Sequence, residues 1–251
     1  MGTEDPAARS LPMALLFHVS DLHFGREDTG AVRWFADLVR QERPDAVICT
    51  GDLTMRARAR EFAAAQAWLA SLGVPVTVEP GNHDLPYFNP LARLLHPYRR
   101  FRAVAAAIAR PLALPGVMLV PLKTTARLQL RNLSLGRVSR SGLPAALAAL
   151  RAKPAGAIAL VACHHPLASV DHGRTRGGAE ALASLAEAGA DAVLSGHVHD
   201  AFDLPWHGHG RIVRLIGAGT LSRRVRSTPP SFNALRIEQG MIDLTVRVMP
   251  I

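Results

Sequence analysis

The chain has 251 residues, of which 49% are hydrophobic and 20% charged, a composition typical of a soluble globular protein with a sizeable core. This composition excludes a disordered, collagen-like or coiled-coil chain. The 29 Lys and Arg residues against 20 Asp and Glu residues give a net charge of +9, which favours anionic partners. All basic residues except Lys123 and Lys153 are arginines, however, so codon bias explains the charge equally well.

Cysteine usage and hydropathy bear on where the protein works. Cys49 and Cys163 each end an apolar run, which predicts buried free thiols in a reducing compartment and therefore a cytoplasmic protein. The apolar stretch 11–19 is too short for a secretory signal, and no stretch reaches the roughly 18 apolar residues of a membrane span. We expect residues 1–10 to form a flexible tail and residues 11–251 to form one domain.

Short apolar runs alternate with segments of helical period, the pattern of an α/β fold with parallel strands and crossover helices. The predicted strands are 13–19, 46–50, 75–79, 117–122, 127–133, 157–163 and 192–195. The predicted helices are 31–41, with Thr29 as its N-cap, 58–71, 143–152 and 179–188. The apolar runs 211–216, 233–238 and 241–248 with tight turns between them indicate an antiparallel edge or a second sheet.

The segment 89–110 has apolar residues near helical spacing and arginines on its other faces, so it is basic and amphipathic. Pro97 predicts a kink or a break into two helices. One interpretation is a helix that packs its apolar stripe on the protein core. The other is a cap or membrane-surface patch that presents arginines to anionic head groups or to a lipid-linked phosphate.

Five polar clusters each follow a predicted strand: Asp21-Leu22-His23, Gly51-Asp52, Gly81-Asn82-His83-Asp84, His164-His165 and Gly196-His197-Val198-His199. Each cluster alone is a weak signal, because a Gly-Asp pair is usually a turn and a lone His-x-His is usually solvated or packed in a core. Because the carboxyl ends of parallel strands meet in one crevice, five clusters in series indicate one site. His18 lies within the first predicted strand, and we expect it to be a packed core residue.

Two carboxylates, an amide and four or five imidazoles form a mixed oxygen and nitrogen donor set that suits divalent transition metals, and its size suits two ions. Two ions about 3.5–4 Å apart clamp the attacking and leaving oxygens of a displacement at phosphorus and lower the pKa of a bound water. No cysteine belongs to the set, which argues against a structural zinc site. The glycines in the clusters permit sharp turns and close approach to a phosphate.

The five clusters resemble the ordered blocks of the calcineurin-like metallophosphoesterase family, which read Asp-x-His, Gly-Asp, Gly-Asn-His-(Asp/Glu), His and Gly-His-x-His. They span residues 21–199. The flanking residues also resemble the bacterial cyclic-nucleotide phosphodiesterase-like branch; these are Ser20, Phe24-Gly25, Thr50, Leu53-Thr54 and Gly217-Ala218-Gly219-Thr220. The resemblance implies a metal-dependent phosphoric ester hydrolase with a four-layer αββα sandwich of two mixed β-sheets.

The resemblance also implies the roles of the site residues. One ion would be bound by Asp21, His23, Asp52 and His199, and the other by Asp52, Asn82, His164 and His197, so that Asp52 bridges them. The ions would be divalent or trivalent transition metals, with Mn, Fe and Zn expected first. His83 would contact the phosphate and protonate or stabilise the leaving oxygen, with Asp84 orienting it. Either His164 or His165 could fill the fourth block; we favour His164, because in the family the ligand closes the apolar strand.

We therefore expect a dinuclear metallophosphodiesterase that hydrolyses small phosphodiesters through a metal-bridging hydroxide, with cyclic nucleotides such as cAMP as the first candidates. The alternative is a pyrophosphohydrolase of a nucleotide-linked lipid, such as a UDP-diacylglucosamine-type substrate, with 89–110 holding an acyl chain. A protein Ser/Thr phosphatase is disfavoured, because the second block continues Leu53-Thr54-Met55-Arg56 and the third ends in Asp84 instead of Glu.

Three further expectations concern partners. A nucleic acid is not expected, because the chain has no tract of interleaved aromatic and basic residues for gripping a strand. A binding scaffold without catalysis is disfavoured, because such a protein would have degraded ligand blocks and all five are intact here. A monomer and a homodimer are equally compatible with the sequence.

Overall fold

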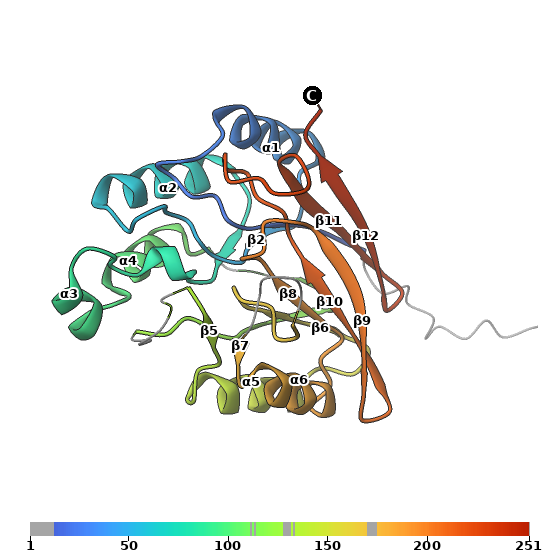
Figure 1. Cartoon of the computed structure of the whole chain (residues 1–251). Coiled ribbons are helices and arrows are strands. Elements are labelled where there is room, and N and C mark those ends of the chain that lie inside the picture. The colour runs from blue at the N-terminus through green and yellow to red at the C-terminus, as the bar shows by residue number, and fades with distance from the viewer. Residues whose placement is uncertain are drawn as a thin grey trace, which may run out of the picture.

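Two five-stranded sheets pack face to face at the centre of the molecule (Figure 1). The structure is a computed structural model, and it describes residues 13–110, 112, 114–127, 132, 134–169 and 175–250. The first sheet has the order β12 (Met241–Val248), β11 (Ser231–Glu238), β1 (Ala14–Val19), β2 (Ala46–Cys49) and β3 (Val76–Val78). The second has the order β4 (Val117–Pro121), β6 (Ile158–Ala162), β8 (Ala192–Ser195), β10 (Arg211–Gly217) and β9 (Phe202–Gly208).

Both sheets are mixed. Strands β1, β2 and β3 run parallel, and so do β4, β6, β8 and β10. Strand β11 pairs antiparallel with β1 and β12, and β9 pairs antiparallel with β10. Two short strands, β5 (Gly136–Arg137) and β7 (Thr175–Arg176), pair with each other. In each sheet the parallel strands end at the same edge. The polar clusters of the sequence come directly after these strands and therefore lie at that edge.

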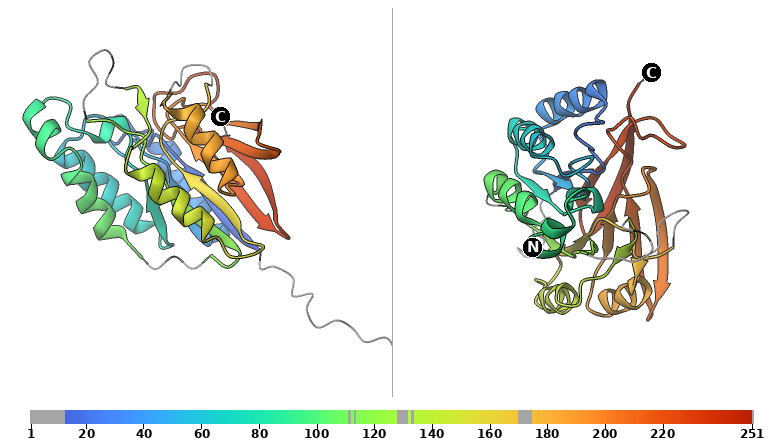
Figure 2. Two further views of the ribbon diagram at one scale, coloured as in Figure 1. Left: turned by 90° about the horizontal axis from the view of Figure 1, so that it is seen from below. Right: turned by 60° about the vertical axis from the view of Figure 1, so that its left-hand side comes forward.

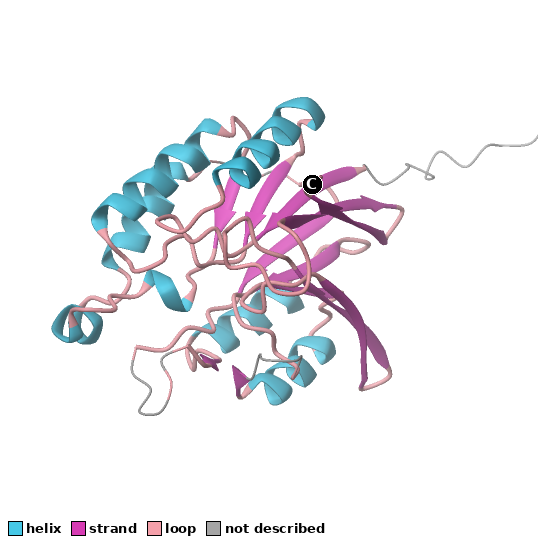
Figure 3. Cartoon of the chain, turned by 45° about the horizontal axis from the view of Figure 1, so that its top comes forward, coloured by secondary structure: helices cyan, strands magenta, loops and turns pink. Residues whose placement is uncertain are grey.

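Helices cover the outer face of each sheet (Figures 2 and 3). The first sheet carries α1 (Thr29–Glu42), α2 (Ala59–Ser71) and α4 (Arg99–Ile108), and the second carries α5 (Gly142–Arg151) and α6 (Gly178–Glu187). A short 3₁₀ helix, η1 (Asn82–Asp84), and the short helix α3 (Pro90–Leu95) lie between β3 and α4. The helix, sheet, sheet, helix order confirms the predicted four-layer αββα sandwich.

Three hydrophobic clusters fill the spaces between the four layers, and β1 shows how one strand serves two of them. Phe17 packs under the helices, with its ring centroid 6.0 Å from that of Phe35 and 4.8 Å from that of Phe232. Its neighbour Leu16 points the other way, into the cluster between the two sheets. Because successive side chains of a strand alternate between its faces, a continuous apolar run is what a strand buried on both faces requires.

Several predicted elements differ from the structure in detail. Helix α1 is capped by Asp28 and not by Thr29, because the Asp28 Oδ1 atom accepts hydrogen bonds from the N–H groups of Gly30 and Ala31 at 2.9 and 3.0 Å. Strand β9 was not predicted. The predicted strand 127–133 lies mostly outside the described residues, as does the predicted tail 1–10.

The segment 89–110 breaks at Pro97 into α3 and α4, as predicted. Helix α4 buries Phe101, Val104 and Ile108 in the cluster under the first sheet, so for α4 the packing interpretation is confirmed. Helix α3 differs, because its Leu91 is 65% exposed. No helix within the described ranges is long and apolar enough to cross a membrane.

Other predictions concerned buried polar and thiol groups. Cys49 and Cys163 are both buried and free, as expected. His18 is fully buried, with its Nε2 atom 3.0 Å from the Thr50 hydroxyl, and the Asn233 amide donates to its Nδ1 atom at 3.3 Å. Both ring nitrogens are therefore occupied by protein groups, which confirms His18 as a packed core residue.

Candidate metal centre

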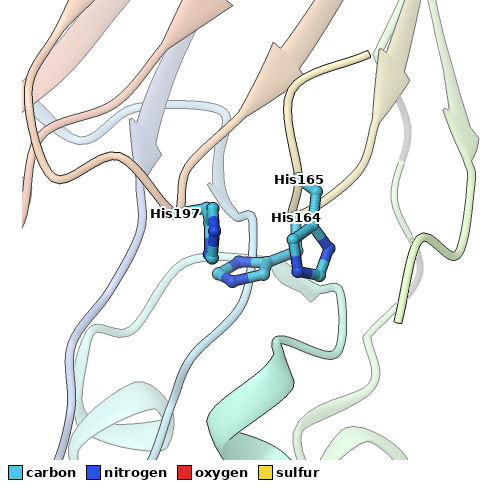
Figure 4. Close-up of side chains that lie close together, drawn as sticks. All are labelled: His164, His165 and His197. Atoms are coloured by element: carbon cyan, nitrogen blue, oxygen red, sulfur yellow. The ribbon is translucent and has the colours of Figure 1, made fainter. Parts of the chain in front are cut away.

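The five polar clusters converge at the carboxyl ends of β1, β2, β6 and β8 and on η1. Three-residue groups of side chains there place their donor atoms within 4.8 Å of one another: Asp21, His23 and His199; His23, Asp52 and His83; Asp21, Asp52 and His164; His164, His165 and His197. Figure 4 shows the last group, in which the histidines from the ends of β6 and β8 face each other. The sequence-predicted ligands therefore lie together in the structure.

The first half of the site is formed by Asp21, His23 and His199. The Nε2 atoms of His23 and His199 approach each other to 3.1 Å, and they lie 3.5 and 3.2 Å from the Asp21 Oδ1 atom. His199 donates its Nδ1 proton to the Arg224 carbonyl at 2.6 Å, so its Nε2 atom carries the free lone pair. The buried Asp21 Oδ1 atom has no hydrogen-bond partner. Two imidazole nitrogens and a carboxylate oxygen that lie within 4.8 Å of one another form a candidate cation site.

The second half is formed by Asp52, Asn82 and His164. The His164 Nε2 atom lies 3.1 Å from the Asn82 Oδ1 atom and 3.5 Å from the Asp52 Oδ2 atom. His164 donates its Nδ1 proton to the Thr50 carbonyl at 2.8 Å, which directs Nε2 toward Asp52 and Asn82. The same partner type, a backbone carbonyl, thus fixes the tautomer of both His164 and His199.

Asp52 connects the two halves. Its Oδ2 atom lies 3.7 Å from the His23 Nε2 atom on one side and 3.5 Å from the His164 Nε2 atom on the other. Its Oδ1 atom accepts a hydrogen bond from the His83 backbone N–H at 2.7 Å, which fixes the carboxylate. Burial opposes ionisation of Asp52, but the surrounding imidazoles, with His164 first, hold its pKa well below its usual range.

His197 completes the second half. Its ring centroid lies 5.2 Å from that of His164, and its backbone N–H donates to the Asp21 Oδ2 atom at 2.7 Å. Burial lowers the pKa of His197 to about 4, so the ring is neutral at physiological pH and can offer a lone pair.

The backbone of the site is strained where the ligands lie. Five predicted ligands have left-handed backbone conformations, with φ between 46° and 72°: Asp21, His23, Asp52, His197 and His199. Only a few per cent of non-glycine residues adopt such φ values, at a cost of about 1–3 kcal/mol each. A cluster of them on one set of side chains shows that the loops are shaped to aim these groups inward.

Two glycines of the clusters are required by close packing. A Cβ atom on Gly81 would lie 2.1 Å from the Asp52 Oδ1 atom, and one on Gly196 would lie 1.8 Å from the Ser20 Oγ atom. Neither contact is sterically possible. The backbone at both positions therefore packs directly against the loops that carry Asp52 and Asp21.

Known proteins that resemble this chain agree with a metal-binding role for these residues. Residues 15–201 match the family of calcineurin-like phosphoesterases. The chain belongs to that family. Membership confirms the family predicted from the five sequence blocks, a family of metal-dependent phosphoester hydrolases with dinuclear metal centres.

Individual relatives match less completely. The chain is 37% identical over 93 residues to the glycerophosphodiester phosphodiesterase GpdQ of Enterobacter lignolyticus, a match that covers 31% of this chain and 34% of that relative. Among solved structures, a dimetal phosphatase from Danio rerio is similar with a TM-score of 0.64 and 14% identity, over 93% of this chain and 98% of that one. The purple acid phosphatase PPD1 from yellow lupin has a TM-score of 0.67 and 13% identity, over 94% and 52%. The two structures support the fold.

The doubled histidine of this calcineurin-like phosphoesterase separates into two environments. Both ring nitrogens of His165 are occupied, since Nδ1 lies 3.0 Å from the Thr124 hydroxyl and Nε2 lies 3.0 Å from the Ser134 carbonyl. His164 instead directs its Nε2 atom at the candidate ligands Asp52 and Asn82. The geometry therefore favours His164 as the ligand and gives His165 a structural environment.

His83 projects from η1 beside the two halves of the site. Its Nδ1 atom donates to the Met55 carbonyl at 2.7 Å, and its Nε2 atom lies 3.1 Å from an amino group of Arg224. Asp84 was expected to orient the His83 ring, but the described contacts give that role to the Met55 carbonyl, and the Asp84 carboxylate bonds other groups. It accepts hydrogen bonds from the N–H groups of Leu53, Thr54 and Gly81 and from the Thr54 hydroxyl.

Asp84 therefore ties the loop after β2 to the loop after β3. Burial and the neighbouring charge of Asp52 raise its pKa to about 7, and the backbone donors of Gly81 and Thr54 oppose that shift. Its effect on His83 comes through the backbone of η1, since the two residues are adjacent in the same turn.

Arg224 is a site residue that sequence reasoning missed. Its guanidinium lies 3.1 Å from the His83 Nε2 atom and 3.4 Å from the His23 Nε2 atom, and its carbonyl fixes His199. It brings a permanent positive charge to the point where a phosphoryl group would meet His83. The chain is rich in arginine and Arg224 lies well beyond the last sequence block, so no pattern in the sequence distinguishes it from the other arginines.

Proposed function

We propose that this calcineurin-like phosphoesterase is a dinuclear metal-dependent phosphodiesterase that hydrolyses small phosphodiesters. The position of the Asp52 Oδ2 atom between the His23 and His164 nitrogens supports this proposal most strongly, because a bridging carboxylate requires a donor set on each side. Asp21, His23, Asp52 and His199 would hold one ion; Asp52, Asn82, His164 and His197 would hold the other. When bound, the two ions supply Lewis acidity and a bound water of lowered pKa.

The chain's own residues would then act on the leaving group. With the Nδ1 proton of His83 donated to the Met55 carbonyl, Nε2 is the nitrogen that faces the site, and it accepts from Arg224 in the neutral ring. In the imidazolium form Nε2 would carry a second proton, taken from water, and would donate that proton to the leaving oxygen. Arg224 beside it would hold a phosphoryl oxygen and stabilise the charge that develops in the transition state. Mn, Fe and Zn all accept this donor set.

A diester preference is supported by the partial similarity to a glycerophosphodiester phosphodiesterase. Small organic diesters are thus the first substrates to test, and cyclic nucleotides such as cAMP belong to the same panel. The free buried thiols of Cys49 and Cys163 support a reducing, cytoplasmic location.

The test is hydrolysis of bis(p-nitrophenyl) phosphate and of p-nitrophenyl phosphate by metal-stripped protein, with and without added Mn²⁺. We expect cleavage only after metal addition, and faster cleavage of the diester. His83→Ala should lower turnover by roughly 10²–10⁴-fold while metal content stays at the wild-type level. The matched control is His207→Ala on the exposed strand β9. Equal rates in His83→Ala and wild type would refute the role of His83.

A second candidate, pyrophosphohydrolysis of a nucleotide-linked lipid such as a UDP-diacylglucosamine-type molecule, is favoured by one observation. Directly after η1, the chain exposes Phe88 and Leu91 to 64% and 65%, and the Arg56 guanidinium lies 5.3 Å from the Phe88 ring centroid. Exposed apolar side chains flanked by arginines suit acyl chains and an anionic membrane surface.

This candidate predicts that removing the acyl chains from the substrate lowers its turnover, and that Phe88→Ser has a similar effect. The matched control is Leu204→Ser, which is 44% exposed on β9. Equal turnover of the acylated and acyl-free nucleotides would contradict the lipid candidate and leave the small diesters.

A further inference from the structure

A cavity of about 470 Å³ lies between the α3–α4 segment and the stretches 123–127 and 137–140. Four cationic side chains line it: Lys123, Arg127, Arg137 and Arg140. The lining also includes Leu94 and Tyr98 and contains no Asp or Glu. We call this space the cationic pocket.

No carboxylate of the described residues neutralises the positive charge of the cationic pocket. All Lys and Arg ion pairs within the described ranges involve other basic side chains, so no described carboxylate lies within 4.0 Å of these four groups. The Lys123 Nζ atom lies 4.7 Å from the Tyr98 ring centroid, and burial together with the neighbouring Arg102 and Arg127 lowers the Lys123 pKa. Like charges gathered in a concave site favour the binding of an anion.

The walls of the cationic pocket are held by buried polar contacts. Arg93 is only 4% exposed, and its Nε atom donates to the Arg127 carbonyl at 2.7 Å. The Tyr98 hydroxyl donates to the Thr125 carbonyl at 3.1 Å. The Arg127 side chain donates to the Leu94 carbonyl at 3.2 Å. These contacts hold the walls of the pocket, and among the described residues no hydrogen bond or ion pair occupies the head groups of Lys123, Arg137 and Arg140.

A single histidine connects this pocket to the metal centre. The Thr124 hydroxyl, one residue from Lys123, lies 3.0 Å from the His165 Nδ1 atom, and the His165 ring centroid lies 4.5 Å from that of His197. The backbone on the two sides of the pocket is also joined here, because the Arg137 N–H donates to the Thr124 carbonyl at 2.7 Å. The side chains of Thr124 and His165 thus link the pocket wall to the candidate ligand His197.

We propose that the cationic pocket binds a second phosphate group of the substrate, one that is not cleaved, so that the preferred substrates are small diesters that also carry a phosphate monoester. A dianionic phosphate matches several cationic donors, and Leu94 and Tyr98 offer an apolar wall to the organic part that carries it. This inference rests on the proposed diesterase activity.

The kinetic test uses two chromogenic diesters, thymidine 5′-(p-nitrophenyl phosphate) with and without a 3′-phosphate. For the metal-loaded full chain we expect kcat/KM to be at least about tenfold higher with the 3′-phosphate. Lys123→Met, which keeps the stem on Tyr98, and Arg140→Gln, which changes an exposed side chain, should each bring this ratio toward one without slowing the unphosphorylated diester. Arg236→Gln is the control, since it removes one exposed positive charge on β11.

A wild-type ratio near one, or an equal ratio in Lys123→Met and Arg236→Gln, would overturn the proposal. Binding of inorganic phosphate to the metal-stripped full chain, measured by isothermal titration, tests the pocket without phosphate binding to metal ions, and it does so even if neither diester is cleaved and the proposed function fails. We expect one binding event that Lys123→Met weakens at least about tenfold and Arg236→Gln leaves unchanged. Equal phosphate binding by all three proteins would also overturn the proposal. If free phosphate binds the pocket but the 3′-phosphate gives no kinetic advantage, the ligand is a separate molecule and the substrate assignment is wrong.

Discussion

His164 and His165 are adjacent in sequence, yet the structure predicts opposite results when each is replaced by alanine. His164→Ala removes a nitrogen that faces Asp52 and Asn82, so we expect the protein to lose at least one of two ions and its diesterase activity. His165→Ala removes a ring that bonds the Thr124 hydroxyl and the Ser134 carbonyl. The backbone N–H of residue 165 still bonds the Thr124 hydroxyl in this variant, so the Ser134 carbonyl is the group left without its partner. Leaving one buried polar group unpaired predicts a loss of about 1–3 kcal/mol of unfolding free energy.

The lower half of that range is expected, because Ser134 is half-buried and water can reach its carbonyl. Metal content per chain is measured by elemental analysis after dialysis against a metal-free buffer, and the free energy of unfolding by urea titration. Each variant is the matched control of the other. Two ions per chain in His164→Ala together with metal loss in His165→Ala would refute the assignment of the ligand.

Three further predictions concern the loops and strand around the site. Asp84→Ala leaves three buried N–H groups unpaired and should lower the urea-unfolding free energy by roughly 3–6 kcal/mol; a loss below about 1 kcal/mol would contradict its role as a tie between loops. Gly81→Ala forces a Cβ atom against Asp52 and should abolish binding of two ions, whereas full metal content would contradict the close packing. Burial raises the pKa of Glu79 to about 8, so the folded state binds more protons than the unfolded state, whose pKa is near 4.5. Glu79 should therefore lower stability between pH 5 and 8 by at most about 1.4 kcal/mol per pH unit, beside a contribution of the same sign from Asp84. Glu79→Gln should make the slope shallower in urea titrations, and an unchanged slope would contradict this prediction.

The main features of the fold and site were predictable because they follow from strand ends. Parallel strands carry their carboxyl ends to one edge, so polar clusters after successive apolar runs must meet, and the clusters from Asp21 to His199 do so. The alternation of apolar runs and helical periods likewise placed α1, α2, α5 and α6 to within a few residues. These patterns predict the elements reliably because each is repeated along the chain and agrees with the others.

The features that the sequence did not predict depend on contacts to the backbone or on single residues. The orientation of His83 comes from the Met55 carbonyl, and a carbonyl has no sequence signature. Both Asp28 and Thr29 can cap a helix, and only the path of the chain into α1 decides between them. Strand β9 contains Pro205 and lies at a sheet edge, where a missing N–H is tolerated but the sequence pattern is weak.

A metal titration of diesterase activity distinguishes a two-metal centre bridged by Asp52 from a site that needs one ion. Metal-stripped protein is given increasing equivalents of Mn²⁺, while bound metal and bis(p-nitrophenyl) phosphate hydrolysis are measured in the same samples. We predict that activity rises until two ions are bound per chain, and that Asp52→Asn neither binds the second ion nor regains activity. Full activity at one ion per chain, or full activity of Asp52→Asn, would contradict the two-metal account.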